Sequence, residues 1–311
     1  MSPNDYSHAL VTGGAGFIGS HLTRTLLARG MKVTILDNLS TGTRAAVAPE
    51  ARFIEGDIRS RSDVEDALEG VDCVFHMAAK VSVRGSFENF YEDVETNIMG
   101  TSNVIRCLHG KTVKHFILAS SMAVYADADS SEPIGESHPC SPISPYGIGK
   151  MCDELLCAQM LEQLGISFTA FRYFNTYGPG QQFTPYVGVI TIFVTRLLEG
   201  KSPMVFGDGA QQRDFVHVDD IVAGTVAALG GPPGIYNLGT GRSTSVLELA
   251  RLLVQRINPG VEVTFAPVQP GELVNSIANI DAARTQLGYQ PQRVLEQDIG
   301  SVIDYIKGLK Q

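Results

Sequence analysis

The 311-residue sequence has few of the features that mark membrane, secreted or nucleic-acid-binding proteins. No apolar run approaches 18 residues, and the start, MSPNDYSHALVTGG, lacks the basic and apolar stretches of a signal peptide. Positive charge is scarce, because 24 Lys and Arg stand against 33 Asp and Glu. A general nucleic-acid surface needs clustered cations. We therefore expect a soluble cytoplasmic protein that binds neither nucleic acid nor a membrane.

The five cysteines are too few and too scattered for a disulfide framework or a zinc cluster. The seven histidines show no H-E-x-x-H or related ligand spacing. His217 lies near Asp219 and Asp220, which we interpret as a helix N-terminus with acidic residues in its first turn. We expect reduced, mostly buried cysteines and no metal site.

Short apolar segments alternate with longer segments of helical periodicity, which is typical of βαβ units. The strand candidates are residues 8–12, 32–36, 52–56, 72–77, 115–120 and 167–173, and the helical candidates are 17–29, 92–108 and 146–164. Strands that are apolar throughout belong to a parallel sheet covered on both faces. We expect an α/β fold with a Rossmann-type doubly wound parallel sheet in residues 1–173, a return segment near 213–240, and a smaller C-terminal substrate-binding lobe in 174–311.

The first strand leads into TGGAGFIGSHL, a glycine-rich turn in which Gly13, Gly16 and Gly19 have the spacing of a dinucleotide-binding loop. Such glycines permit a tight turn and let backbone N–H groups approach a pyrophosphate at a helix N-terminus. Eighteen residues later, the second strand ends at Asp37, whose carboxylate can bind ribose hydroxyls and would repel a 2′-phosphate. The pattern predicts NAD rather than NADP, with Arg44 as the one nearby cation that argues the other way.

The stretch SPYGIGKM places Tyr146 four residues before Lys150, on one face of a helix that begins at Pro145. An adjacent positive charge lowers the pKa of a phenol, so Tyr146 is a candidate general base near neutral pH. Gly147 and Gly149 are poor helix formers. We interpret them as room for a group that passes close to the helix backbone.

The apolar run 116–119 ends at Ser120 and Ser121, at the carboxyl end of a predicted parallel strand, where such sheets bind ligands. Either serine alone is better explained as a turn cap. The order of glycine loop, acidic strand end, Ser121 and Tyr146-x-x-x-Lys150 resembles the extended short-chain dehydrogenase/reductase family, in particular its NAD-dependent nucleotide-sugar 4-epimerases. The resemblance extends over nearly the whole chain, through segments such as RYFNTYGPGQ, GDGAQQRDFVHVDD and YNLGTG.

The resemblance implies NAD-dependent 4-epimerisation of a UDP-hexose, such as UDP-glucose or UDP-galactose, through a transient 4-keto sugar. Tyr146 would take the proton of the sugar 4-hydroxyl. Lys150 would hold the nicotinamide ribose and lower the pKa of Tyr146. Ser121 would hydrogen-bond the same sugar oxygen, where charge develops during the reaction.

The same resemblance implies two sets of binding residues. For NAD these are Gly13, Gly16, Phe17, Ile18, Gly19, Asp37, Asn38, Asp57, Ile58, Lys80, Asn97, Tyr146 and Lys150. For the nucleotide sugar they are Ser121, Asn175, Val189, Phe206, Arg213, Gln269 and Ser276. Structural roles stay open as alternatives, namely a turn for Asn175, the core for Phe206 and a surface ion pair for Arg213.

Three features, at four positions, set this sequence apart within the family that it resembles or narrow its reaction. After Ser121 it has Met122 and Ala123, where 4,6-dehydratases carry an Asp-Glu pair and UDP-glucuronate decarboxylases a glutamate, so those reactions are disfavoured. Gln269 stands where many members have an arginine that grips the diphosphate. Ser276 is a small residue at a position that gates sugar size, so we expect the pocket to admit N-acetylhexosamine.

Two alternatives to UDP-hexose epimerisation stay open. An epimerase of another nucleotide sugar, such as a dTDP-deoxyhexose or a UDP-uronate, would use the same catalytic residues. A non-catalytic NAD(H)-binding regulator belongs to a different functional class, and the intact set of Ser121, Tyr146 and Lys150 weighs against it.

The resemblance also implies a homodimer formed through the helices near 92–108 and 146–164. Four apolar residues of the second helix could serve that interface or the core equally well. They are Leu155, Leu156, Met160 and Leu161.

Overall fold

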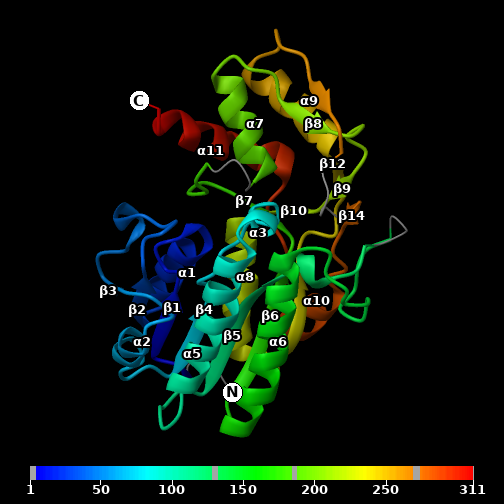
Figure 1. Ribbon diagram of the computed structural model, residues 1–311. Coiled ribbons are helices and arrows are strands. Elements are labelled where there is room, and N and C mark those ends of the chain that lie inside the picture. The colour runs from blue at the N-terminus through cyan, green and yellow to red at the C-terminus, as the bar shows by residue number, and fades with distance from the viewer. Residues whose placement is uncertain (1–4, 128–131, 184–187, 269–273, 311) are drawn as a thin grey trace.

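The computed structural model describes residues 5–127, 132–183, 188–268 and 274–310, which form a larger lower lobe and a smaller upper lobe in Figure 1. The strands are β1 His8–Thr12, β2 Lys32–Asp37, β3 Arg52–Glu55, β4 Cys73–His76, β5 His115–Ser121, β6 Ser167–Tyr173, β7 Asn175–Tyr177, β8 Met204–Phe206, β9 Gln212–Arg213, β10 Phe215–His217, β11 Gly234–Leu238, β12 Thr244–Ser245, β13 Thr264–Ala266 and β14 Asn275–Ser276. The helices are α1 Phe17–Ala28, α2 Arg61–Ala67, α3 Gly85–Glu88, α4 Phe90–Asp93, α5 Gly100–Cys107, α6 Pro145–Leu164, α7 Val189–Leu198, α8 Val218–Ala227, α9 Val246–Ile257, α10 Asp281–Leu287 and α11 Leu295–Gly308.

The lower lobe is built on a seven-stranded parallel sheet in the order β3-β2-β1-β4-β5-β6-β11. All six strands predicted from the apolar segments are present, so the Rossmann-type fold is confirmed. Strand order reverses between β1 and β4, and the carboxyl ends of the strands on either side of such a point open a crevice for ligands. Strand β11 brings the chain back to the sheet from within the expected return segment 213–240. The division of the chain at residue 173 stays a prediction.

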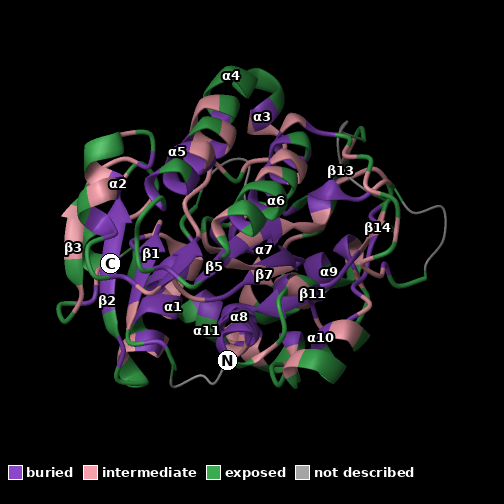
Figure 2. Cartoon of the chain, turned by 90° about the horizontal axis from the view of Figure 1, so that it is seen from below, coloured by how far each residue is buried: buried purple, intermediate pink, exposed green. Residues whose placement is uncertain are grey.

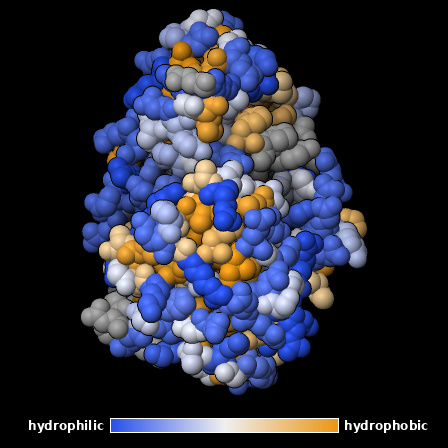
Figure 3. Space-filling model, turned by 90° about the vertical axis from the view of Figure 1, so that its left-hand side faces the viewer, coloured by the Kyte–Doolittle hydropathy of each residue, from blue (hydrophilic) through white to orange (hydrophobic). Residues whose placement is uncertain are grey.

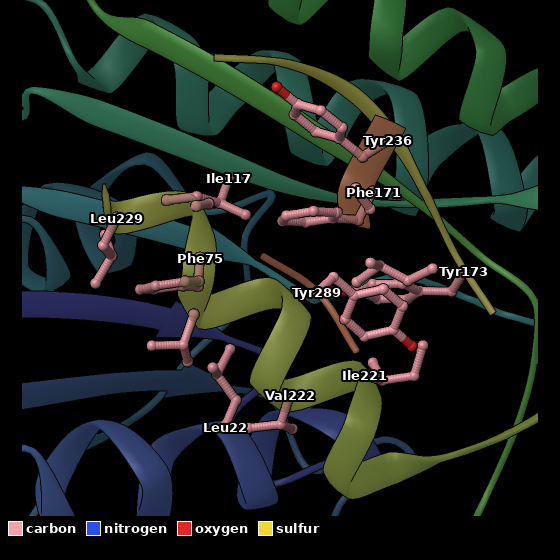
Figure 4. Packing of buried hydrophobic residues seen from close by; sticks show 14 of the residues in the cluster. Leu22, Phe75, Ile117, Phe171, Tyr173, Ile221, Val222, Leu229, Tyr236 and Tyr289 are labelled. Atoms are coloured by element: carbon pink, nitrogen blue, oxygen red, sulfur yellow. The ribbon is translucent and has the colours of Figure 1, made fainter. Parts of the chain in front are cut away.

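Helices cover both faces of the sheet, as the view in Figure 2 shows, with α1, α8 and α10 on one side and α2, α5 and α6 on the other. Figure 4 shows part of the first layer, in which Leu22 of α1 and Val222 of α8 lie below Phe75 of β4, while Phe171 of β6 lies beside Tyr236 of β11. In the upper lobe, α7, α9 and α11 enclose a separate apolar core. No helix among the described residues is both long and apolar enough to cross a membrane.

The helix predicted over 92–108 is real but irregular. It runs from α4 into α5 through a π-helical segment, Val94–Met99, whose wider turn the 3.6-residue pattern did not indicate. Asn97 lies in this segment with its side chain buried. Such bulges are frequent at functional sites.

Helix α6 begins and ends where its sequence signals place it. Ser144 is the N-cap and its hydroxyl accepts a hydrogen bond from the N–H of Gly147 at 3.1 Å, while Pro145 occupies the first turn. Gly165 ends the helix with a left-handed φ of 68°. His217 likewise caps α8 by accepting a hydrogen bond from the N–H of Asp219, so its interpretation as part of a helix N-terminus is confirmed.

A buried ion pair fixes α6 to the sheet. Arg172 of β6 donates to both carboxylate oxygens of Glu154, at 3.0 and 2.7 Å, and both side chains are only 5% exposed. Glu154 also accepts a hydrogen bond from the hydroxyl of Ser120 at the end of β5. The pair therefore joins α6, β5 and β6 next to the sheet edge that binds ligands in this fold.

We predict that Glu154→Gln lowers the free energy of unfolding by about 3–5 kcal/mol, because it leaves the buried Arg172 charge without its partner. Urea-induced unfolding measures the loss. The matched control is Glu65→Gln, which breaks the exposed pair with Arg61 and should cost less than about 1 kcal/mol. Equal losses of unfolding free energy in the two variants would show that the buried pair stabilises the fold no more than the exposed pair does.

Candidate active site

A cavity of about 1610 Å³ lies between the two lobes. Its floor is formed by the carboxyl ends of sheet strands and the loops that follow them, and its roof by residues of β8, β9 and α7. Figure 3 shows hydrophobic residues gathered at mid-height on one face of the molecule, at the level where the two lobes meet.

Most of the predicted site residues line this cavity. They are Gly13, Gly16, Phe17, Ile18, Gly19, Asp37, Asn38, Ile58, Lys80, Ser121, Tyr146, Lys150, Asn175, Val189, Phe206 and Arg213. Asp57, Asn97 and Ser276 are not among the lining residues, but each is hydrogen-bonded to one that is. Gln269 falls outside the described residues.

The glycine loop is packed so tightly that it has no room for side chains at its glycines. A Cβ on Gly19 would lie 2.1 Å from the carbonyl oxygen of Gly13, so no larger residue fits there. The N-cap of α1 is Gly16, which offers no side chain to the free N–H groups of the first turn, and that turn holds no acidic residue. Unpaired N–H groups and the positive end of the helix dipole suit an anionic phosphate.

Asp37 is oriented by backbone donors. Its two oxygens accept hydrogen bonds from the N–H groups of Ala15 at 2.9 Å and Leu39 at 2.8 Å. Leu39 has a φ of 56°, an uncommon value for leucine that brings its N–H to the carboxylate. Each carboxylate oxygen keeps a further lone pair for a ribose hydroxyl. Arg44 does not line the cavity; its guanidinium lies 3.6 Å from Glu55 and stacks over the Phe53 ring at 4.3 Å.

Asp57 acts on two neighbours that do line the cavity. Arg59 donates to its oxygens at 2.9 and 2.7 Å, and the amide of Asn38 donates at 3.0 Å. The Arg59 hydrogen bonds are the largest cause of an Asp57 pKa lowered to about 2. Direct contact of Asp57 with the cofactor stays a prediction.

Asn97 supports the loop after β4. Its side chain accepts a hydrogen bond from the N–H of Lys80 at 2.8 Å and donates to the Lys80 carbonyl at 3.0 Å. The π-helical turn thus fixes the backbone of Lys80 at the cavity wall. The Lys80 ammonium itself is paired with Glu92.

Ser121, Tyr146 and Lys150 meet on the cavity wall. The Ser121 Oγ accepts a hydrogen bond from the N–H of Ala123 at 3.2 Å, which leaves its hydroxyl hydrogen for the Tyr146 phenol. That hydrogen bond and the Lys150 charge both lower the Tyr146 pKa, as the sequence predicts. Burial outweighs them, however, and the net Tyr146 pKa is raised from its usual value. The expectation of a lowered pKa was wrong because it ignored desolvation of the phenolate.

The two glycines beside Tyr146 differ in their surroundings. A Cβ on Gly147 would lie 2.2 Å from the carbonyl oxygen of Ala123, in the turn that follows β5. A Cβ on Gly149 would meet only Asn97, at an ordinary 3.9 Å. The prediction that another group passes close to the helix backbone is therefore confirmed at Gly147, where that group is the backbone of Ala123. It is wrong at Gly149, where an alanine side chain would fit.

The upper lobe contributes a buried arginine to the cavity. One guanidinium nitrogen of Arg213 donates to the carbonyls of Gln212 at 2.9 Å and Val274 at 3.2 Å. Asn175 also lines the cavity, and its Oδ1 accepts a hydrogen bond from the hydroxyl of Ser276 at 3.3 Å. Ser276 is thus placed to influence the pocket through Asn175.

Sequence reasoning missed two charged residues. Arg84 lines the cavity and its guanidinium stacks over the Phe206 ring at 4.5 Å, so it connects the lower lobe to the upper one. The available signal was a second cation, after Lys80, in the loop that follows the carboxyl end of β4. Asp153 lies buried beside Lys150. Its place three residues after Lys150, on the same face of the predicted helix, is the signal that could have found it. Among the described residues, no group of three His, Cys, Asp or Glu could hold a metal ion.

Comparison with known proteins gives consistent matches. The sequence pattern of the NAD dependent epimerase/dehydratase family matches residues 9–239. A putative UDP-glucose 4-epimerase of Methanocaldococcus jannaschii is 36% identical over 299 residues, covering 96% of this chain and 98% of that protein.

Two solved structures share the fold closely. The UDP-glucose 4-epimerase of Thermotoga maritima with UDP-glucose has a TM-score of 0.94 at 34% identity, covering 98% of this chain and 100% of that one. The UDP-glucuronic acid 4-epimerase of Bacillus cereus, in complex with UDP-glucuronic acid and NAD, has a TM-score of 0.89 at 33% identity, covering 97% and 99%.

We predict opposite effects of alanine at the two glycines of the Tyr146 turn. Gly147→Ala should destabilise the protein by about 1–3 kcal/mol through overpacking, and should reduce turnover by moving Tyr146 away from Ser121. Gly149→Ala should be neutral or stabilise the helix by up to about 1 kcal/mol. Chemical unfolding and activity assays of both variants measure these effects. A Gly147→Ala variant with unchanged stability and turnover would contradict the close contact between Gly147 and Ala123.

Proposed function

This chain belongs to the NAD-dependent epimerase/dehydratase family, and on that basis we propose that it catalyses the 4-epimerisation of a UDP-sugar with NAD as cofactor. The order of motifs in the sequence predicted this family, and the match over residues 9–239 confirms it. The observation that carries the proposal is the meeting of Ser121, Tyr146 and Lys150 in a cavity that also contains the glycine loop.

The described residues fit NAD. The uncapped N-terminus of α1 suits its pyrophosphate, the Asp37 carboxylate suits its adenosine ribose, and Lys150 reaches the cavity from α6 to meet its second ribose. When bound, NAD would supply a reversible acceptor for the hydride of the sugar C4–H bond. The chain itself must supply binding, orientation and proton transfer.

Tyr146 accepts the proton of the sugar 4-hydroxyl as C4 is oxidised. It returns that proton to the same oxygen when the 4-keto sugar is reduced. Lys150 favours the phenolate by its charge, and Ser121 donates a hydrogen bond at the same point. Because burial opposes phenolate formation, these two favourable interactions are needed for the base to function. Arg213 supplies positive charge in the upper lobe, where the diphosphate of a nucleotide sugar would need it.

We propose UDP-glucose and UDP-galactose as the substrates, with N-acetylated forms admitted because Ser276 is small. Ser276 contacts Asn175 rather than the cavity, so a bulky residue there would have to push Asn175 into the pocket. A UDP-uronate is the second candidate, because the B. cereus structure at 33% identity is that of a UDP-glucuronic acid 4-epimerase.

A panel of nucleotide sugars tests this proposal. The purified protein is incubated separately with UDP-glucose, UDP-N-acetylglucosamine, UDP-glucuronate and a dTDP-hexose, and the products are resolved by NMR. We expect a 4-epimer of UDP-glucose, and turnover reduced by about 10²–10⁴-fold in Tyr146→Phe, which keeps the ring and removes the hydroxyl.

The binding of NAD, measured by calorimetry, should be retained in Tyr146→Phe, so that lost activity reflects the base. Full turnover in this variant would remove Tyr146 as the base. No product from any sugar, with NAD bound, would favour the non-catalytic regulator.

We also infer a homodimer in the cytoplasm, formed through the helices over residues 92–108, which run from α4 to α5, and 146–164, which belong to α6. Of the four apolar residues considered on α6, Leu156 and Leu161 pack in the core, whereas Leu155 is 62% exposed and Met160 is partly exposed. Exposed Ile148 on the same helix extends the apolar surface that a second copy would cover.

A charge in this surface should dissociate the dimer. We predict that Leu155→Asp is monomeric by light scattering after size exclusion, since an unpaired carboxylate would be buried at the interface. Phe265→Asp, which changes a comparably exposed residue of the upper lobe, is the control and should stay dimeric. A monomeric wild-type protein would refute the inference.

A further inference from the structure

Lys150 and Asp153 form a buried pair that the reaction described above does not use. They lie three residues apart on α6, with the Lys150 Nζ 3.4 Å from the Asp153 Oδ2. Lys150 is 2% exposed and Asp153 is fully buried. A buried charge needs compensation, and here each ion is placed to compensate the other.

The carboxyl of Asp153 is incompletely satisfied. Its Oδ1 has no hydrogen-bond partner among the described residues, although the nearby Thr101 hydroxyl of α5 helps to stabilise the ionised form. Burial dominates and raises the Asp153 pKa to about 6, against the lowering effect of Lys150. Asp153 is thus a group whose charge changes within the range of pH in which enzymes work.

The other ionisable groups around Asp153 do not take the place of Lys150. His76 of β4 hydrogen-bonds Thr101 at 3.0 Å, and its pKa is lowered to about 3 by burial, so its ring is neutral. On α6, burial raises the thiol pKa values of Cys152 and Cys157. Glu154 is held by Arg172.

Asp153 also acts on the tyrosine. Its charge raises the Tyr146 pKa, as does the more weakly acting Asp93 of α4. In addition, an ionised Asp153 neutralises part of the Lys150 field that favours the phenolate. Both effects have the same sign, since each makes Tyr146 harder to deprotonate when Asp153 is ionised.

We propose that Asp153 is a positioning residue that holds the Lys150 ammonium and sets the pH at which Tyr146 becomes able to accept a proton. The catalytic part of this inference rests on the proposed function, but the acidity of Tyr146 does not. At neutral pH, ionised Asp153 disfavours the Tyr146 phenolate. Removal of its charge therefore lowers the pH range in which Tyr146 can act as the base.

The test is a titration of Tyr146 in the holoenzyme. The ultraviolet absorbance of tyrosinate is followed against pH, and Tyr146→Phe in the same background is subtracted to isolate this residue among the ten tyrosines. In Asp153→Asn, which keeps the volume and removes the charge, the midpoint should fall by about one pH unit, a tenfold change in the phenolate-to-phenol ratio. The acid limb of the kcat–pH profile should shift in the same direction.

Two further variants make the result specific. Asp93→Asn removes a charge that is not paired with Lys150 and should give a smaller shift. Thr101→Val removes a hydroxyl that favours ionised Asp153 and keeps the side-chain shape. Because Asp153 stays ionised at the much higher pH of the Tyr146 midpoint, this variant should leave the midpoint unchanged and serves as the control for packing around Asp153.

An unchanged or raised midpoint in Asp153→Asn overturns the inference, as does an equal shift in Asp93→Asn. A midpoint that falls as far in Thr101→Val as in Asp153→Asn overturns it as well. A shifted midpoint in a protein that epimerises no sugar would refute the proposed function and leave this inference standing. If the enzyme epimerises a UDP-sugar but the acid limb of its kcat–pH profile does not shift in Asp153→Asn, the proposed function stands and this inference is refuted.

Discussion

Helix α6 carries buried charges against the end of a β-strand, and the active site depends on that attachment. Glu154 joins Arg172 of β6 and Ser120 of β5 on one side of the helix, while Lys150 meets Asp153 close by. Buried ions in poor geometry are costly, so the position of the helix along β5 is closely constrained. Tyr146, one turn before Lys150, is thereby placed next to Ser121 at the strand end.

The same arrangement explains why the site has a tyrosine base that must be assisted. Burial keeps water from the sugar and strengthens each electrostatic interaction, but it also disfavours the phenolate. Lys150 and the Ser121 hydroxyl offset that cost, and Asp153 reduces the help that Lys150 gives. The reactivity of Tyr146 is the balance of these opposing effects.

Local patterns in the sequence were sufficient for the sheet and for most of the site. The apolar strands, the glycine spacing and the Ser144-Pro145 start of α6 each have a local physical cause, so they could be predicted without the fold. The π-helical turn at Val94–Met99 could not, because its extra residue is stabilised by the contact of Asn97 with a distant loop. The net direction of the Tyr146 pKa was missed for a related reason, since desolvation depends on the whole surrounding structure. Arg84 was missed because its partner, Phe206, is 122 positions away and lies in the other lobe.

The central claim is that the hydrogen at C4 of the sugar is removed and restored inside this cavity while Tyr146 exchanges only the hydroxyl proton. UDP-glucose carrying deuterium at C4 tests it directly, with the product isolated from ordinary water and analysed by NMR. Retention of deuterium at C4 of UDP-galactose is the predicted result. Replacement of that deuterium by solvent hydrogen, or a product inverted at any other carbon, would contradict the mechanism.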